Sequence, residues 1–155
     1  MRLKSHARYT TLLLIALLTT VPPAAEAQTS REFAEMGVAM WVGFECSALA
    51  AIFNDEAENA RLFSYAYAEG QAFIAAMQAQ KIDQEHISTV VPSGALMLLG
   101  GPTPDFVLGR IFEAAQENAL KDMFAANGSL TTKEYQVMLA KSRYSHANCS
   151  ILGRK

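Results

Sequence analysis

Three carboxylates on expected helices are the first residues to consider for chemistry. Glu45, Glu69 and Glu113 each lie near the apolar or small-residue face of a helical stretch. Two buried carboxylates close together can act as acid and base or hold a metal ion. Each can equally be exposed, or be paired with a cation such as Arg61 or Arg110. Glu45 stands in an otherwise apolar run, and we expect it to make a structural hydrogen bond or a non-catalytic contact.

Two histidines follow residue 27, His86 and His146, and they belong to different expected helices. Neither lies in an H-E-x-x-H pattern, and the chain has no G-x-S-x-G segment. We expect each histidine to be a surface residue or a hydrogen-bonded core residue. No catalytic residue is predicted.

Six methionines follow residue 27, and Met36 and Met40 share one helical face. Thioether groups bind Cu(I), so these two with a histidine could form a metal-handling site. Methionine also fills irregular gaps in apolar cores. Because all six lie in apolar segments, core packing is the favoured interpretation, and no metal or cofactor is predicted. The six are Met36, Met40, Met77, Met97, Met123 and Met138.

A glycine- and proline-rich segment, residues 100–105, precedes an expected helix. Free N–H groups at a helix start can bind an anion. The segment lacks the G-K-[ST] of a phosphate loop, and Asp105 in the first turn would repel an anion. Thr103 as N-cap and Pro104 at the first helical position account for the same residues. A proline-braced loop of this kind is also a reasonable contact surface.

The first 27 residues have the pattern of a cleavable export signal. Three basic residues precede an uncharged apolar run at 12–18, and Ala25-Glu26-Ala27 follows two prolines. We expect cleavage between Ala27 and Gln28 and a location in the periplasm or outside the cell; a retained helix is the alternative. Removing this segment takes three basic residues and one acidic residue from totals of 13 and 15, leaving a net charge near −4. An acidic chain without a basic stripe is a poor nucleic-acid binder.

Both cysteines, Cys46 and Cys149, lie after the predicted cleavage point. In an exported chain they most simply pair with each other. Such a bond would close a loop of about 100 residues and contribute up to about 4–5 kcal/mol. It would connect the first helix with the C-terminal tail. Two free thiols or a metal pair with a histidine are the alternatives.

Apolar spacing and capping patterns predict the helices. Thr29 with Glu32, Asp55 with Glu58 and Thr131 with Glu134 have the spacing of capping boxes, and Leu130 with Tyr135 that of a hydrophobic staple. Four long helices are predicted from about 29 to 53, 56 to 80, 104 to 126 and 131 to 147, with a short one at 83–90. Residues 93–99 are ambiguous, and Asn127-Gly128 is a helix stop. Gly43, Gly70 and Gly109 fall inside helices, where we expect close helix–helix approach.

These elements predict an all-α fold, a compact bundle of four main helices with one or two short ones. After the signal segment, we expect residues 28–155 to form one domain stapled by one disulfide. The apolar segment 36–53 is nearly long enough to span a membrane. The carboxylate of Glu45 at its centre makes a buried helix of a soluble bundle the better explanation.

The layout resembles the small periplasmic immunity proteins of bacterial type VI secretion systems. The shared features are a signal peptide, an early cysteine at Cys46, the segment Tyr67-Ala68-Glu69-Gly70 and a late cysteine at Cys149. The sequence departs from the family pattern in having no cysteine beside Tyr67. The resemblance implies an all-helical protein that blocks a cell-wall-degrading effector by binding it.

Three functions are therefore considered. The first is an exported, non-catalytic helical protein that binds a protein partner in the periplasm, such as an immunity protein or inhibitor. The second is a small periplasmic enzyme or ligand-binding protein with a polar pocket between helices that contains Glu45, Glu69, Asp105 or Arg110. The third is the metal-handling protein. The partner is an unidentified envelope protein and not nucleic acid, and a homo-oligomer is left open. The candidate contact or pocket residues are Glu45, Tyr67, Glu69, Asp105 and Arg110.

Overall fold

The computed structural model describes residues 28–123, 129 and 131–154, and these parts of the chain are helical without any strand. The predicted export signal, the Asn127-Gly128 stop and Leu130 of the expected staple lie outside the described residues. The helices are α1 (Ser30–Ile52), α2 (Glu56–Gln78), α3 (Gln84–Thr89), α4 (Ser93–Leu96), α5 (Pro104–Leu120) and α6 (Lys133–His146). Short 3₁₀ turns follow α5 at Lys121–Met123 and α6 at Cys149–Ile151. The all-α prediction, with four long helices, is confirmed.

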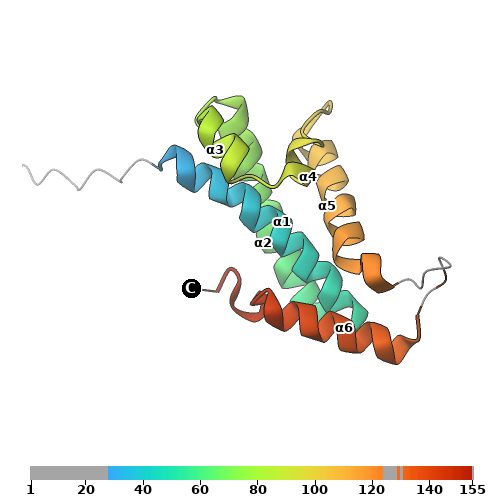
Figure 1. Cartoon of the computed structure of the whole chain (residues 1–155). Helices are drawn as coiled ribbons and strands as arrows, with labels where there is room; N and C mark the ends of the chain where they lie inside the picture. Colours follow the sequence, from blue (N-terminus) through green and yellow to red (C-terminus); the bar gives the residue numbers. More distant parts are fainter. Residues whose placement is uncertain (1–27, 124–128, 130, 155) are drawn as a thin grey trace, which may run out of the picture.

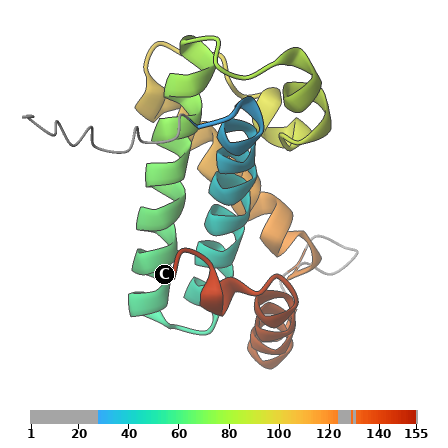
Figure 2. The same ribbon diagram turned by 90° about the vertical axis from the view of Figure 1, so that its left-hand side faces the viewer.

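The two longest helices, α1 and α2, lie side by side as an antiparallel pair (Figure 2). A Cβ atom added to Gly43 would come within 2.8 Å of the Ala66 Cβ, and one added to Gly70 within 2.4 Å of Leu108 Cδ2. Two of the three expected close approaches are therefore confirmed. The missing side chains let α2 pack directly against α1 and against α5.

Helices α5 and α6 complete the bundle around α1 (Figure 1). One large core cluster joins α1, α2, α4 and α5 around the fully buried rings of Phe44 and Phe73. A second cluster lies where α6 crosses the other end of α1, around Leu49 and Ala140. α1 is therefore the central helix against which the others pack.

Most helix starts follow the predicted caps. Thr29 forms a complete capping box with Glu32, and the Thr103 hydroxyl accepts from the Phe106 N–H. Asp55 caps α2 by accepting from the Glu58 N–H, but the Glu58 side chain does not return to Asp55. The second capping box is therefore only half formed, because the Glu58 carboxylate has stronger cationic partners.

The predicted cap of the last helix is wrong by one residue. Thr132, and not Thr131, accepts from the Tyr135 N–H and begins α6. The Thr131 hydroxyl donates instead to the Met123 carbonyl at 2.9 Å, which holds the start of α6 against the end of α5. Two adjacent threonines could each cap the helix, and the tertiary contact of the first decides between them.

α1 is the one described helix long and apolar enough to cross a membrane by length and composition. Half of its most apolar window is buried inside the fold. Its buried residues contact α2, α5 and α6, as predicted for a core helix.

The methionines do not all enter the core. Met40 is fully buried and its sulfur lies beside Gly70, as the packing interpretation predicts. Met97 and Met138 are 83% and 60% exposed, so core packing is wrong for these two. Met97 follows the last residue of α4, and Met138 lies on an exposed face of α6.

The disulfide predicted between Cys46 and Cys149 is present, with a Cα–Cα distance of 5.6 Å. Both cysteines are fully buried, in a cluster with Ala50 and Leu62. The bond connects the middle of α1 to the tail after α6, as predicted. Because disulfides persist in oxidising surroundings, it indicates an oxidising compartment.

Candidate functional site

Exposed and half-buried aromatic side chains lie on α2 and α5, two helices that ring contacts and a hydrogen bond connect. We call this region the α2–α5 aromatic surface and define it by Phe63, Tyr67, Asp105, Phe106, Gly109 and Phe112. Phe63 and Phe106 are 39% and 50% exposed. Large apolar side chains that remain in water on neighbouring helices are a common feature of binding surfaces.

The rings on this surface are held in defined positions. Phe63 stacks on Tyr67 with centroids 6.1 Å apart and meets Phe112 edge-on at 5.4 Å. The buried ring of Phe44 on α1 lies behind both, 5.7 Å from Phe63 and 5.3 Å from Phe112. Edge-to-face pairs add to the energy of burial and restrict ring motion. The surface is therefore preorganised before any partner arrives.

A hydrogen bond connects the two helices at one end of the surface. The Tyr67 hydroxyl donates to Asp105 Oδ1 at 2.6 Å. This bond, followed by partial burial and the Asp105 charge, raises the pKa of the Tyr67 hydroxyl. Asp105 lies in the first turn of α5, where a negative charge is favoured by the helix dipole. Two residues predicted as contact candidates thus meet across the helix pair.

Arg110 holds the loop before α5. Its guanidinium donates to the Gly100 carbonyl at 2.7 Å and lies 5.9 Å from the centroid of the Phe106 ring. Three of the five predicted contact residues, Tyr67, Asp105 and Arg110, therefore lie at or beside the α2–α5 aromatic surface.

Gly109 does not have the role predicted for it. A Cβ atom added there would meet nothing within 4 Å, whereas Gly43 and Gly70 are tightly packed. Glycine inside a helix costs about 1 kcal/mol relative to alanine. No described packing contact offsets this cost at Gly109. The glycine leaves the surface between Phe106 and Phe112 free of any side chain.

Glu69 is half-buried on α2 and does not belong to the aromatic surface. Burial raises the pKa of the Glu69 carboxyl group. Burial, and then the charge of Glu69, raises the pKa of the neighbouring Tyr65 hydroxyl. Tyr65 packs against Gly153 of the C-terminal tail, within 2.5 Å of an added Cβ. Glu69 thus lies one turn of α2 after the tyrosine against which the tail packs.

Glu45 makes the structural hydrogen bonds expected for it. Its Oε1 accepts from Trp41 Nε1 at 2.9 Å and from Asn118 Nδ2 on α5. It lines a hollow of about 250 Å³ between α1, the end of α5 and α6. The hollow is lined by Glu45, Cys46, Leu49, Asn118, Ala119, Lys121, Arg143, His146 and Ala147.

The structure does not gather the four residues predicted for a polar pocket. Glu45 lines this hollow, Arg110 lines another beside Glu113, and Asp105 is bonded to Tyr67 at the surface. Glu69 lies on α2, and none of the described pockets contains more than one of these four residues.

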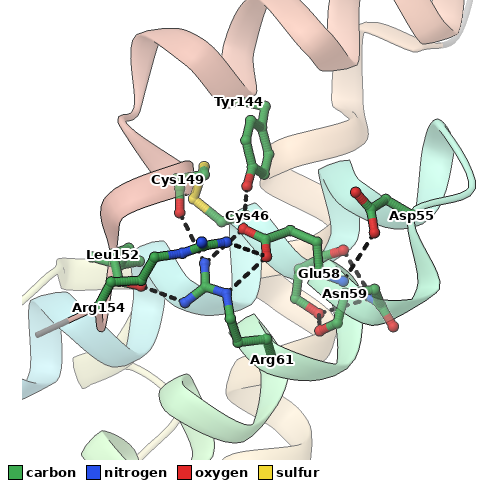
Figure 3. A network of polar contacts seen from close by, with 10 residues as sticks. Cys46, Asp55, Glu58, Asn59, Arg61, Tyr144, Cys149, Leu152 and Arg154 are labelled. Carbon is green, nitrogen blue, oxygen red and sulfur yellow. Dashed lines mark hydrogen bonds and ion pairs between the residues drawn. A yellow bond between two sulfur atoms is a disulfide. The ribbon is translucent and has the colours of Figure 1, made fainter.

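Arg61 pairs with a different carboxylate from those predicted. Two of its nitrogens lie 2.6 and 2.7 Å from the oxygens of Glu58, and the same guanidinium donates to the carbonyls of Leu152 and Cys149. Tyr144 and Arg154 also contact Glu58, as Figure 3 shows. Glu113, another expected partner, is exposed on α5. This cluster fastens the tail beside the disulfide.

The electrostatics of this cluster are set by its cations. The hydrogen bond from Arg61 has the largest effect on the pKa of Glu58. Together with the hydrogen bond from Tyr144 and the charge of Arg154, it lowers this pKa by more than burial raises it. The pKa of Glu58 falls from 4.5 to about 2. Burial and the Glu58 carboxylate raise the pKa of Tyr144 from 10.0 to about 12.

The histidines have different surroundings. His86 Nδ1 lies 2.7 Å from the Ser30 hydroxyl, which also accepts from the Asp83 N–H. This contact holds the start of α1 against α3, so His86 is a hydrogen-bonded residue as expected. His146 is exposed at the hollow beside Glu45. Among the described residues, no group of three or more His, Cys, Asp or Glu is placed to hold a metal ion.

Several of these residues were missed by sequence reasoning. Phe63 lies four residues before Tyr67, so both fall on one face of α2, and this spacing could have indicated the aromatic pair. The partner of Glu45 on α5, Asn118, carries no such signal. Comparisons with protein-family models, curated proteins and solved structures found no match to this chain.

Proposed function

We propose that the protein is an exported, non-catalytic helical protein that binds a protein partner in the periplasm through the α2–α5 aromatic surface, as an inhibitor of the immunity-protein kind. The observation that carries this proposal is the combination of exposed, fixed aromatic rings with the uncovered backbone of Gly109. The resemblance to periplasmic immunity proteins supports the inhibitory role, since Tyr67 of the matching segment lies on this surface.

The chemistry of the surface suits a protein partner. Interfaces are enriched in aromatic residues and arginine, and a few such side chains carry most of the binding energy. Phe63 and Phe106 supply apolar area, while Tyr67, Asp105 and Arg110 supply directional polar groups. Rings already fixed by their neighbours lose little entropy on binding.

The compartment supports the same proposal. A buried disulfide connects α1 with the tail, and an oxidising compartment maintains it. A chain held in this way keeps its surface in shape outside the cytoplasm, where an inhibitor of a cell-wall enzyme must act. The predicted export signal would deliver the chain to that compartment.

A glycine substitution offers the sharpest test. Gly109→Gln places a side chain over the surface without a clash, since a Cβ atom there meets nothing within 4 Å. The oxidised protein, residues 28–155, is immobilised and exposed to periplasmic extract, and captured proteins are identified by mass spectrometry. The purified partner is then titrated by calorimetry and, where it is an enzyme, assayed for inhibition.

The matched control is Ser145→Gln, which makes a similar change at an exposed position of α6. We expect wild type and the control to bind the partner in a one-to-one complex, and Gly109→Gln to lose at least about tenfold in affinity. Equal binding by both variants contradicts the assignment to this surface. Failure of the folded wild type to bind any envelope protein contradicts the proposed function.

A further inference from the structure

The hollow beside Glu45 has a fixed negative group on one side. Trp41 and Asn118 both donate to Glu45 Oε1, so the carboxylate is held in one orientation. Its second oxygen makes no hydrogen bond with any described residue. A carboxylate oxygen oriented in this way is a ready acceptor for an ammonium group.

Two cationic or ionisable groups on the rim are free to meet a ligand. Lys121 Nζ makes one long hydrogen bond, 3.4 Å, to Asn118 Oδ1, and it has no ion pair within the described part of the chain. The ring of His146 has no hydrogen bond or ion pair there either. Arg143 is different, because it is bonded to Asp122 and to the Ala119 carbonyl.

The walls between these groups are apolar and small. Leu49 and Ala119 are 3% and 6% exposed, and Cys46 of the disulfide also lines the hollow. A volume of about 250 Å³ lies just below the range for drug-sized ligands. A small metabolite fits this volume, and a folded partner does not.

We propose that this hollow is a binding site for a short peptide with free amino and carboxyl termini. Its ammonium group would pair with Glu45, its carboxylate with Lys121 and His146, and its small side chains would contact Leu49 and Ala119. A simple anion would be repelled by the carboxylate of Glu45, and a simple cation would be repelled by the ammonium group of Lys121. A zwitterion can pair with both of these residues. The site shares no residue with the α2–α5 aromatic surface, so the two proposals stand separately.

The chain carries a reporter at this site. Trp41 is its single tryptophan, and the indole N–H donates directly to Glu45. Binding at the second carboxylate oxygen must alter that hydrogen bond. It will therefore shift the Trp41 indole N–H resonance, and a carboxylate bound by Lys121 and His146 will shift the ring resonances of His146.

The experiment compares three probes on the oxidised protein. L-Alanyl-L-alanine carries both charges, its N-acetyl derivative only the carboxylate, and its C-terminal amide only the ammonium group. We expect the free dipeptide to shift the Trp41 and His146 signals with a millimolar or lower Kd. Each blocked form should bind at least about tenfold more weakly, because each loses one charge-assisted contact.

Two variants assign the contacts. Glu45→Gln keeps an oxygen for the Trp41 and Asn118 hydrogen bonds and should remove the preference for a free amino group. Lys121→Ala should weaken the preference for a free carboxylate. The controls, Glu85→Gln and Lys141→Ala, are exposed and lie outside the hollow, and they should bind like wild type.

Three results would overturn the proposal: equal binding of all three probes, absence of any Trp41 shift at millimolar dipeptide, or unchanged selectivity in Glu45→Gln. If that variant does not fold, the three probes on wild type still decide the outcome.

Discussion

The hydroxyl of Tyr144 on α6 donates to the carboxylate of Glu58 on α2, across 86 residues of sequence. The same carboxylate pairs with Arg61 and Arg154. These contacts surround the end of the disulfide and hold the C-terminal tail on α2 (Figure 3). The tail is therefore fastened by a covalent bond and by a charged cluster, and each can be tested by itself.

Acid should weaken the fold through Glu58. Its pKa in the folded chain, about 2, is below the ordinary 4.5, so its stabilising effect is complete above about pH 4.5 and is lost as the pH falls towards 2. After solvent screening we expect a loss of about 1–2 kcal/mol in unfolding free energy. Urea unfolding of wild type and Glu58→Gln across this range measures it. The variant should be less stable at pH 7 and lack this part of the acid dependence; parallel curves would refute the assignment.

Alkali should act through Tyr144. Its pKa is raised from 10.0 to about 12, so the stabilisation it provides is complete below pH 10 and is lost as the pH rises through 12. Phenolate absorbance should show a late-ionising tyrosine in wild type that is absent from Tyr144→Phe. Glu58→Gln should bring this ionisation to lower pH, because it removes a carboxylate that opposes the phenolate. No change in either variant would show that another tyrosine ionises late.

Removal of the disulfide should cost about 2–5 kcal/mol of unfolding free energy, because the bond closes a loop with a sequence separation of 103. Urea unfolding with and without a phosphine reductant measures the loss. The double variant Cys46→Ser/Cys149→Ser should reproduce the reduced wild type and be insensitive to the reductant. A remaining response to reductant in that variant would mean that another effect is being observed.

Two helix glycines should respond to alanine in opposite directions. Gly43→Ala brings a Cβ within 2.8 Å of Ala66, so we expect a loss of about 1–3 kcal/mol from overpacking of α1 on α2. Gly109→Ala meets nothing within 4 Å, so we expect a gain of up to about 1 kcal/mol in helix stability. Thermal unfolding of both variants compares them directly. A loss at Gly109 would show that its surface is covered in the free protein.

Local patterns predicted most of the fold. Thr29, Asp55 and Thr103 begin helices where the sequence places them, because a cap is a contact between residues three positions apart. The error at Thr131 has the opposite origin. Its hydroxyl donates to the Met123 carbonyl, eight residues away, and no local sequence pattern predicts this contact.

The candidate sites were predicted only in part. The packing of α2 and α5 brings Tyr67 to Asp105, and Arg110 lies farther along α5, whereas Glu45 and Glu69 lie elsewhere. Helical spacing tells which residues share a face of one helix, but not which other helix covers that face.

The sequence by itself predicted the four long helices, favoured pairing of the two cysteines and indicated that α1 is buried, since these follow from capping, residue count and apolar spacing. Only the tertiary structure decided that Met138 is exposed, that Gly109 is uncovered and that Glu58 gathers Arg61, Tyr144 and Arg154. The physical reason is that exposure and charge pairing depend on how helices far apart in the chain dock. That docking is set by the summed packing of the core and not by any short segment.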